Sequence, residues 1–255
     1  MLTLAEIEQY KTDLYNVGTL VQADAVGALR LLEGQPVPVM AGQLREVLPS
    51  IVDVYAEVAS VFAADFFLLA REQVQTTPFL VESSPDYNVE DLTQNAIGFI
   101  AGVQTNGAEF PVTSVYLAGA VQKIVAGKAR STIEYNSSRA GVRYKRIAGP
   151  NACAFCLFAA AVADVATKEQ DKFHDHCNCQ SVPEFEPINE PDYYSDVRDQ
   201  YGQARNKLVA DQEAAKAEYI AGGRDYKKRA FFAAYPETAI NTNNLVREIR
   251  SLRAL

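Results

Sequence analysis

The sequence predicts a mostly α-helical protein with a long helical N-terminal region, a small α+β module stapled by zinc, and a helical C-terminal tail. Over most of the first half, apolar residues recur at three- and four-residue steps, the spacing of amphipathic helices. All four cysteines and both histidines of the 255-residue chain lie in two short pieces, residues 153–156 and 173–180. With 48% hydrophobic and 22% charged residues, the composition is that of an ordinary globular protein able to bury a sizeable core.

Two long helices are expected first, over residues 3–32 and 41–75. Thr3 and Glu6 form the sequence pattern of a capping box, which marks the start of a helix. A glycine and two prolines lie between the two helices and separate them, because neither residue type continues a helix well. Pro49 predicts a kink or a break in the second helix, whose apolar residues lie on several faces and indicate burial between other helices.

The remaining elements are shorter. We expect helices over residues 90–104, 112–141, 154–167, 196–220 and 243–255, a strand and turn over 142–151, and an extended piece over 180–191. The chain is therefore divided into a helical protein-interaction region (1–110), a basic helix with a cysteine–histidine module (111–187) and a helical C-terminal tail (188–255).

No membrane partner is expected, because no apolar run reaches the roughly 18 residues that cross a bilayer. Residues 1–11 contain acids where a signal peptide needs basic residues and then an apolar core. The sequence thus predicts synthesis in a reducing cytoplasm. In that compartment clustered cysteines are more often metal ligands than disulfides.

The net charge of −8 is distributed asymmetrically. Residues 1–122 carry 15 acids and 4 bases, whereas residues 123–146 carry 7 bases and only Glu134 as an acid. Such a basic stretch either forms a solvated helix face or contacts phosphate or an acidic partner surface. The candidates for contact with DNA or an acidic protein are Lys128, Arg130, Arg139, Arg143, Lys145 and Arg146.

The cysteine–histidine cluster has the composition and spacing of a structural zinc site. Two residues separate Cys153 from Cys156, so that one tight turn can present both thiolates to a tetrahedral zinc ion. Such a site would stabilise a loop-rich segment that lacks apolar residues for its own core. A disulfide formed outside the reducing cytosol and unliganded thiols are the alternatives. The second piece contributes the further candidates His174, His176, Cys177 and Cys179.

The two histidines are two residues apart and cannot easily face one metal together. One is expected to ligate zinc, and the other to face solvent or to support a ligand. With both histidines inside the cluster, none is free to activate a nucleophile elsewhere. The sequence also lacks the His-x-Glu pattern of zinc deaminases and the His-Glu-x-x-His pattern of metalloproteases. We therefore expect no enzymatic activity.

At the cluster the sequence resembles the Mu F-like minor head (head morphogenesis) proteins of tailed bacteriophages, in particular those of actinobacteriophages. Their motif is Cys-x-x-Cys, a variable gap, and His-x-x-Cys-x-Cys before an apolar strand. Here His174, Cys177 and Cys179 stand at those spacings, and the similarity covers roughly residues 125–187. His176 is an additional histidine that the motif does not require. Because only a short stretch follows the motif, we do not expect the effector or protease domain that is fused to some relatives.

The resemblance implies a low-copy virion protein at the portal vertex, made in the host cytoplasm and retained near the packaged DNA. It implies a role in head assembly and in genome packaging or ejection. The expected partners are the portal protein, the major capsid protein or both, with packaged double-stranded DNA as a further contact, in a symmetric assembly of several copies. The basic stretch would then face DNA or an acidic portal surface.

Two other functions compete with a minor capsid protein. A zinc-stapled nucleic-acid-binding regulatory module would bind duplex DNA, which the acidic front half disfavours. A metal-dependent hydrolase or nuclease would need an open coordination position and a nearby general base. The sequence shows no such base beside the cluster.

Overall fold

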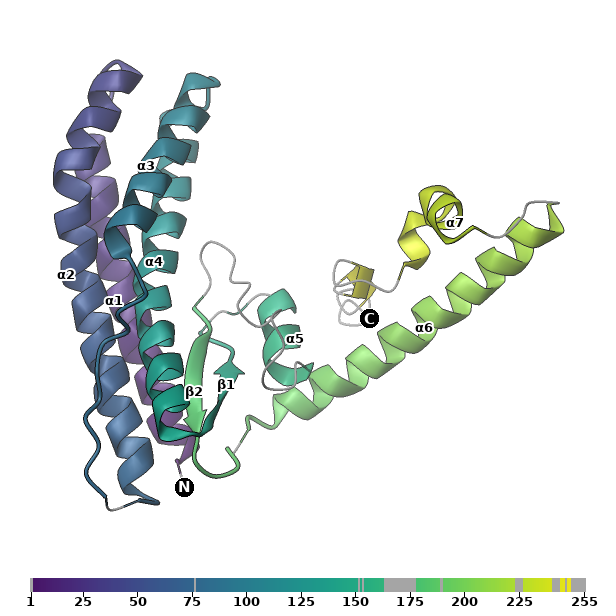
Figure 1. The fold of residues 1–255 in the computed structure, drawn as a ribbon. Helices are drawn as coiled ribbons and strands as arrows, with labels where there is room; N and C mark the ends of the chain where they lie inside the picture. Colours follow the sequence, from purple (N-terminus) through teal and green to yellow (C-terminus); the bar gives the residue numbers. More distant parts are fainter. Residues whose placement is uncertain are drawn as a thin grey trace. The chain divides into compact units, whose positions relative to one another are not determined.

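The structure is a computed structural model in which the chain forms two compact units (Figure 1). The first unit comprises residues 1–152 with 164–190, and the second comprises residues 153–163 with 191–255. The described residues are 2–75, 77–150, 152, 154–162, 178–188, 190–222, 227–239, 244–245 and 247–248. Among the described helices, none combines the length and the apolar character needed to span a membrane.

Four long helices form the body of the first unit. They are α1 (Leu4–Arg30), α2 (Val37–Glu72), α3 (Val89–Thr105) and α4 (Phe110–Ala140). Helix α4 packs against the other three, and α2 packs against α1 and α3 (Figure 1). The predominantly helical fold predicted from the apolar spacing is confirmed.

The first helix begins where the sequence predicts. The Thr3 amide donates to Glu6 Oε2 at 2.7 Å, and the Glu6 amide donates to Thr3 Oγ1 at 3.2 Å. These reciprocal bonds satisfy backbone donors that the first turn leaves without intrahelical partners. Asn88 caps α3 in a related way, because its side chain accepts from the amide of Asp91 at 3.0 Å.

Helix α2 departs from its prediction at both prolines. It begins at Val37 with Pro38 in its first turn, where a proline loses no hydrogen bond because the first amides have no intrahelical acceptor. Of the kink or break predicted at Pro49, the break is absent, since α2 continues through it. An interior proline costs about 3 kcal/mol. Leu48 and Val52 beside it are completely buried, and burial of each stabilises by about 1.5–3 kcal/mol.

A two-stranded antiparallel sheet lies against α4. Strand β1 (Arg143–Ile147) pairs with β2 (Gln180–Glu184). In this register Arg143 lies opposite Glu184, and Ile147 lies opposite Gln180. Ile147 and Val182 are buried, and both strands contact α4. The predicted strand and extended piece are therefore confirmed as partners in one sheet.

The second unit is built on α6 (Tyr193–Ala221), with α5 (Ala154–Val162) packed against it. Arg198 on α6 donates to the carbonyl of Ala161 on α5 at 3.2 Å. Helix α7 (Lys228–Ala234) and the 3-10 turn Pro236–Thr238 follow. Residues 163–167 of the predicted helix 154–167 lie outside the described residues.

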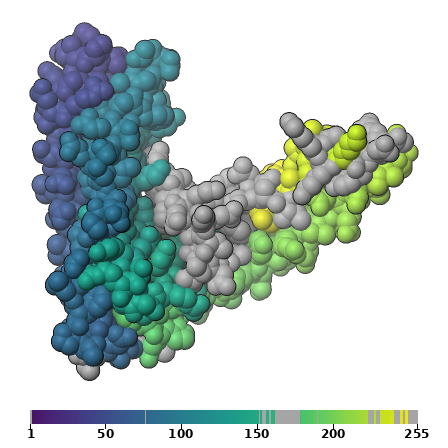
Figure 2. Space-filling view, viewed as in Figure 1, coloured from purple at the N-terminus to yellow at the C-terminus, as the bar shows by residue number. Residues whose placement is uncertain are grey.

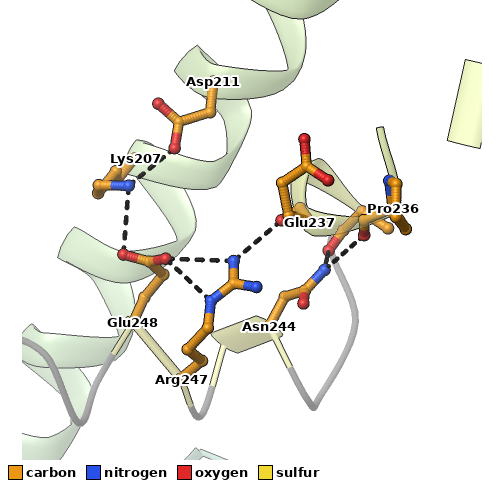
Figure 3. Close-up of polar contacts among 8 residues, drawn as sticks. Lys207, Asp211, Pro236, Glu237, Asn244, Arg247 and Glu248 are labelled. Atoms are coloured by element: carbon orange, nitrogen blue, oxygen red, sulfur yellow. Dashed lines mark hydrogen bonds and ion pairs between the residues drawn. The ribbon is translucent and has the colours of Figure 1, made fainter. Parts of the chain in front are cut away.

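Polar contacts join α6 to the end of the described chain (Figure 3). Lys207 lies 2.8 Å from the carboxylate of Asp211 and 3.2 Å from that of Glu248, and these partners raise the pKa of its ammonium group. The side-chain amide of Asn244 donates to the carbonyl of Pro236 at 2.9 Å. Of the predicted helix 243–255, residues 244–245 and 247–248 are helical, and the rest lie outside the described residues.

Candidate functional site

Two of the predicted zinc ligands can be placed. Cys156 on α5 and Cys179 just before β2 are both buried. Cys153, His174, His176 and Cys177 lie outside the described residues. Within the described ranges no three His, Cys, Asp or Glu side chains come together as a metal site. The zinc ligand set therefore stays a prediction.

The described residues that flank the cluster meet at the end of the sheet. Gly149 lies so close to residue 178 that a Cβ added to it would fall 2.0 Å from the Asn178 carbonyl oxygen. The amide of Ala152 donates to the Gly149 carbonyl at 3.2 Å, which forms a turn. The backbone that leads into the first cysteine pair therefore packs against Asn178, the residue just before the last cysteine.

The middle of helix α4 is buried on every side. Residues 124–130 are all buried, and seven consecutive residues cover almost two full turns. Such a helix contacts neighbours around its whole circumference. Its polar side chains consequently point into the protein, where buried polar groups need hydrogen-bond partners.

Arg130 on α4 binds the end of the segment between β1 and β2 that carries the four cysteines, residues 148–179, called the cysteine segment below. Its guanidinium donates to the Cys179 carbonyl at 3.0 Å and to the Lys123 carbonyl at 3.4 Å, and the residue is 4% exposed. Gln122, two turns away on the same helix, donates to the side-chain carbonyl of Asn178. Two side chains of α4 therefore hold this point of the chain, Arg130 through the Cys179 backbone and Gln122 through the Asn178 side chain.

The same helix binds the segment that connects α2 to α3. Lys128 Nζ donates to the Ser84 carbonyl at 3.0 Å. Asn136 donates to the Glu82 carbonyl at 2.7 Å and accepts from the Glu82 amide at 3.1 Å. Arg139 lies 3.1 Å from the Glu82 carboxylate. These contacts supply backbone partners to a segment that has no regular secondary structure of its own.

The basic stretch is thus largely committed to internal contacts. Lys128, Arg130 and Arg146 are at most 7% exposed, so the solvated-face interpretation is wrong for these three. Lys128 and Arg130 lie on α4 and donate to backbone carbonyls inside the unit, and Arg146 lies on β1. The other three candidates lie beside acids: Arg139 beside Glu82, Arg143 beside Glu184, and Lys145 beside Glu190. Contact with DNA or portal through them stays a prediction.

A groove between α3 and α4 was not predicted from the sequence. Two adjoining cavities of about 270 and 240 Å³ share Tyr87, Leu92 and Lys123 in their walls. Towards Phe99 the lining is apolar, whereas Arg130 and its neighbours make the other end polar. Burial raises the pKa of Tyr87 to about 12, so its hydroxyl is protonated at neutral pH and can donate.

Gly127 lies in the wall of this groove, directly beside Tyr87. A Cβ added to it would lie 1.9 Å from the hydroxyl of Tyr87, which donates to the Ile124 carbonyl at 3.0 Å. We expect Gly127→Ala to destabilise the protein by about 1–3 kcal/mol, because Tyr87 must move, although alanine favours helices. Urea denaturation followed by circular dichroism measures the change.

Gly98→Ala in α3 is the matched control. Gly98 is exposed, and nothing lies within 4 Å of the added Cβ. This variant should gain up to about 1 kcal/mol from helix propensity alone. Equal stabilisation by both alanines would show that Tyr87 does not occupy the space over Gly127.

Comparison with known proteins gives one match. Neither the curated proteins nor the solved structures contain a match to this chain. The family model described as VG15 protein matches residues 1–204, which include α1–α5, the sheet and the first part of α6. VG15 is a phage protein family, so the phage origin implied by the resemblance is confirmed, whereas the Mu F-like type of minor head protein stays a prediction. Since the match covers most of its length, the chain belongs to the VG15 family of phage proteins.

Proposed function

We propose that this protein is a minor structural protein of the phage head. It acts at the portal vertex, in contact with the portal protein or the inner capsid, in head assembly and genome packaging or ejection. It works through binding and has no catalytic turnover. Membership of a phage protein family supports the setting, and the exposed apolar surface of the first unit supports the role.

The observation that carries the proposal is the apolar surface of the helical bundle. Large apolar side chains remain between 37% and 62% exposed along α2, and others are exposed on α3 and α4. Contiguous exposed apolar patches mark surfaces that bind other proteins. A component that is buried in a larger particle can retain such surfaces. The α2 residues concerned are Val39, Val47, Val54, Val58, Val61, Phe62 and Leu69.

Structural zinc forms part of the proposal. Cys153 and Cys156, with two of His174, Cys177 and Cys179, would hold one Zn²⁺ per chain. The contact of Gly149 with Asn178 supports this assignment, because it brings together the described backbone on either side of the cluster. Zinc would supply the folding energy that this segment lacks.

The competing proposal of a DNA-binding regulator has less support. Sequence-independent affinity for DNA depends on exposed cations that neutralise phosphates. Half of the candidate cations are buried, and Arg143 is the most exposed of the others, with 70% of its side chain accessible beside Glu184. Among the six candidates, Arg143 is therefore the one most accessible to packaged DNA in the head.

The composition of purified particles tests the head assignment. Quantitative mass spectrometry of procapsids and of virions should detect the protein in both, in far fewer copies than the major capsid protein. Cross-linking should join it to portal or inner capsid. Presence in infected cells together with absence from both particles would exclude the head role, and a steeply salt-dependent affinity for duplex DNA would then favour the regulator.

A further inference from the structure

The outward face of α2 carries an apolar stripe that no described segment covers. We define the α2 stripe as Val47, Val54, Val58, Val61, Phe62 and Leu69, which are 37–62% exposed. Their spacings of three, four and seven residues place them on one side of the helix. At 1.5 Å per residue the stripe is about 33 Å long. Figure 2 shows the blue surface of α2 along the first unit.

The stripe has to be explained separately from the core of the bundle. The inward face of α2 already buries a complete set of apolar residues, among them Leu44, Leu48 and Phe67. The outward residues are only partly covered by the bundle, and 37–62% of each stays accessible. Exposed Val, Phe and Leu gathered on one side of a helix, here interrupted by the exposed Asp65, are typical of a surface that binds another protein.

The charges beside the stripe define the partner. Every exposed charged residue of α2 between positions 46 and 72 is an acid, namely Glu46, Asp53, Glu57, Asp65 and Glu72. Residues 1–122 as a whole carry 15 acids and 4 bases. A partner with Lys or Arg beside its apolar residues is attracted to this face, whereas an acidic partner is repelled.

A second copy of this chain is a poor occupant for the same reason. Pairing α2 with α2 would bring Asp53, Glu57 and Asp65 of one copy near the acids of the other. Like charges placed together at an interface disfavour the pairing. The charge pattern therefore selects a different protein.

We propose that the α2 stripe binds an amphipathic helix of another protein, with an apolar face flanked by Lys and Arg. The apolar residues and acids of the α2 stripe are features of this chain and do not depend on the proposed function. Only the identification of the partner as a head protein rests on the proposed function. Apolar contacts would supply the affinity, and the acids would select the partner and its orientation.

The test uses the full-length protein and a synthetic peptide of about 24 residues, enough to span the stripe as a helix. The probe peptide carries leucines on one face and lysines beside them. One control peptide has glutamates in place of the lysines, and another has serines in place of the leucines. Fluorescence anisotropy at low and physiological salt should show binding of the probe, at least about tenfold weaker binding of both controls, and weakening by salt.

Two matched double variants locate the site. Val58 and Val61 lie in the stripe, whereas Val112 and Val115 on α4 have the same spacing and similar exposure outside it. We expect Val58→Ser with Val61→Ser to weaken the probe about tenfold or more, and Val112→Ser with Val115→Ser to change its affinity less than about twofold. Circular dichroism verifies that both variants fold.

Several results would overturn the proposal. Equal effects of the two double variants would show that the α2 stripe is not the binding site. Equal binding of the lysine and glutamate peptides would show that the acids of α2 do not select a basic partner. A dimer that the stripe variant dissociates would identify a second copy as the occupant. Cross-links from the stripe to residues 191–255 would identify the protein's own second unit. Failure of peptide binding while the protein is found in particles would overturn this inference and leave the head role intact.

Discussion

Cys179→Ser is expected to reduce bound zinc from about one ion per chain to almost none. Serine is a poor zinc ligand, and Cys179 is completely buried at the point where the cysteine segment joins β2. Apparent zinc-binding energies of about 10–16 kcal/mol in small zinc modules show how strongly a segment without its own core depends on the metal. Elemental analysis of protein purified without a metal-affinity tag measures the zinc. Limited proteolysis should then cut the variant first between β1 and β2.

Val182→Ala is the control for this experiment. Val182 is completely buried in β2, three residues after Cys179, and carries no ligand atom. The alanine should destabilise the sheet while zinc content stays near one per chain. Separate alanine variants of His174 and His176 would show which histidine ligates. Folded wild-type protein that contains almost no metal would end the zinc proposal, and full zinc content in Cys179→Ser would exclude this cysteine as a ligand.

Helices α1–α3 should survive the loss of zinc. Most of their packing does not involve the sheet, because α2 contacts α1 and α3 directly and buries Leu44 and Leu48. The sheet behaves differently, since β1 and β2 both contact α4. Local unfolding is therefore expected to begin between the strands and to stop at α4.

The helices of the first unit were predictable because their signals are local. The capping box of Thr3 and Glu6, the cap of Asn88 and the three- and four-residue apolar spacing all act within one or two turns. The structure corrects two expectations for α2, which begins at Val37 with Pro38 in its first turn and is not broken at Pro49. The effect of a proline depends on its position within the helix and on packing around it, as the complete burial of Leu48 beside Pro49 illustrates.

The burial and the hydrogen-bond partners of the basic side chains were not predictable from local signals. Lys128 and Arg130 donate to backbone carbonyls of Ser84 and Cys179, which lie 44 and 49 residues away. A backbone carbonyl has no signature in the sequence, because every residue carries one. The sequence showed the charge of these residues but not their burial. The cysteine spacing, in contrast, is a local pattern, and its chemistry could be proposed from the sequence alone.

The groove between α3 and α4 illustrates a third limit. A glycine inside a helix such as Gly127 looks unfavourable until Tyr87 is seen to occupy the space of its missing side chain. Tyr87 belongs to the irregular segment before α3, for which the apolar spacing predicts no contacts. Only the folded chain shows why this glycine is there.

Arg130→Met should destabilise the protein by about 2–4 kcal/mol and loosen the backbone around Cys179. Methionine approximates the length of the buried side chain but cannot donate, so the carbonyls of Cys179 and Lys123 both lose a charged donor. A hydrogen bond to a charged group contributes about 1.5–3 kcal/mol, and an unsatisfied buried carbonyl adds a desolvation cost. Chemical denaturation measures the stability, and the rate of zinc loss to a chelator measures the effect on the cluster.

Arg143→Met separates this role from the general effect of removing a cation. Arg143 belongs to the same basic stretch, but 70% of its side chain is exposed, whereas that of its partner Glu184 is 14% exposed. Because water screens the exposed guanidinium, we expect this ion pair to contribute about 1 kcal/mol. Arg130→Lys should fall between the two, because an ammonium group keeps the charge but lacks the planar fork that reaches two carbonyls. We expect zinc to leave Arg130→Met faster than Arg143→Met. Equal stability and equal zinc loss in the two methionine variants would show that Arg130 does not hold the cysteine segment, because its buried hydrogen bonds would then contribute no more than the ion pair of Arg143 with Glu184.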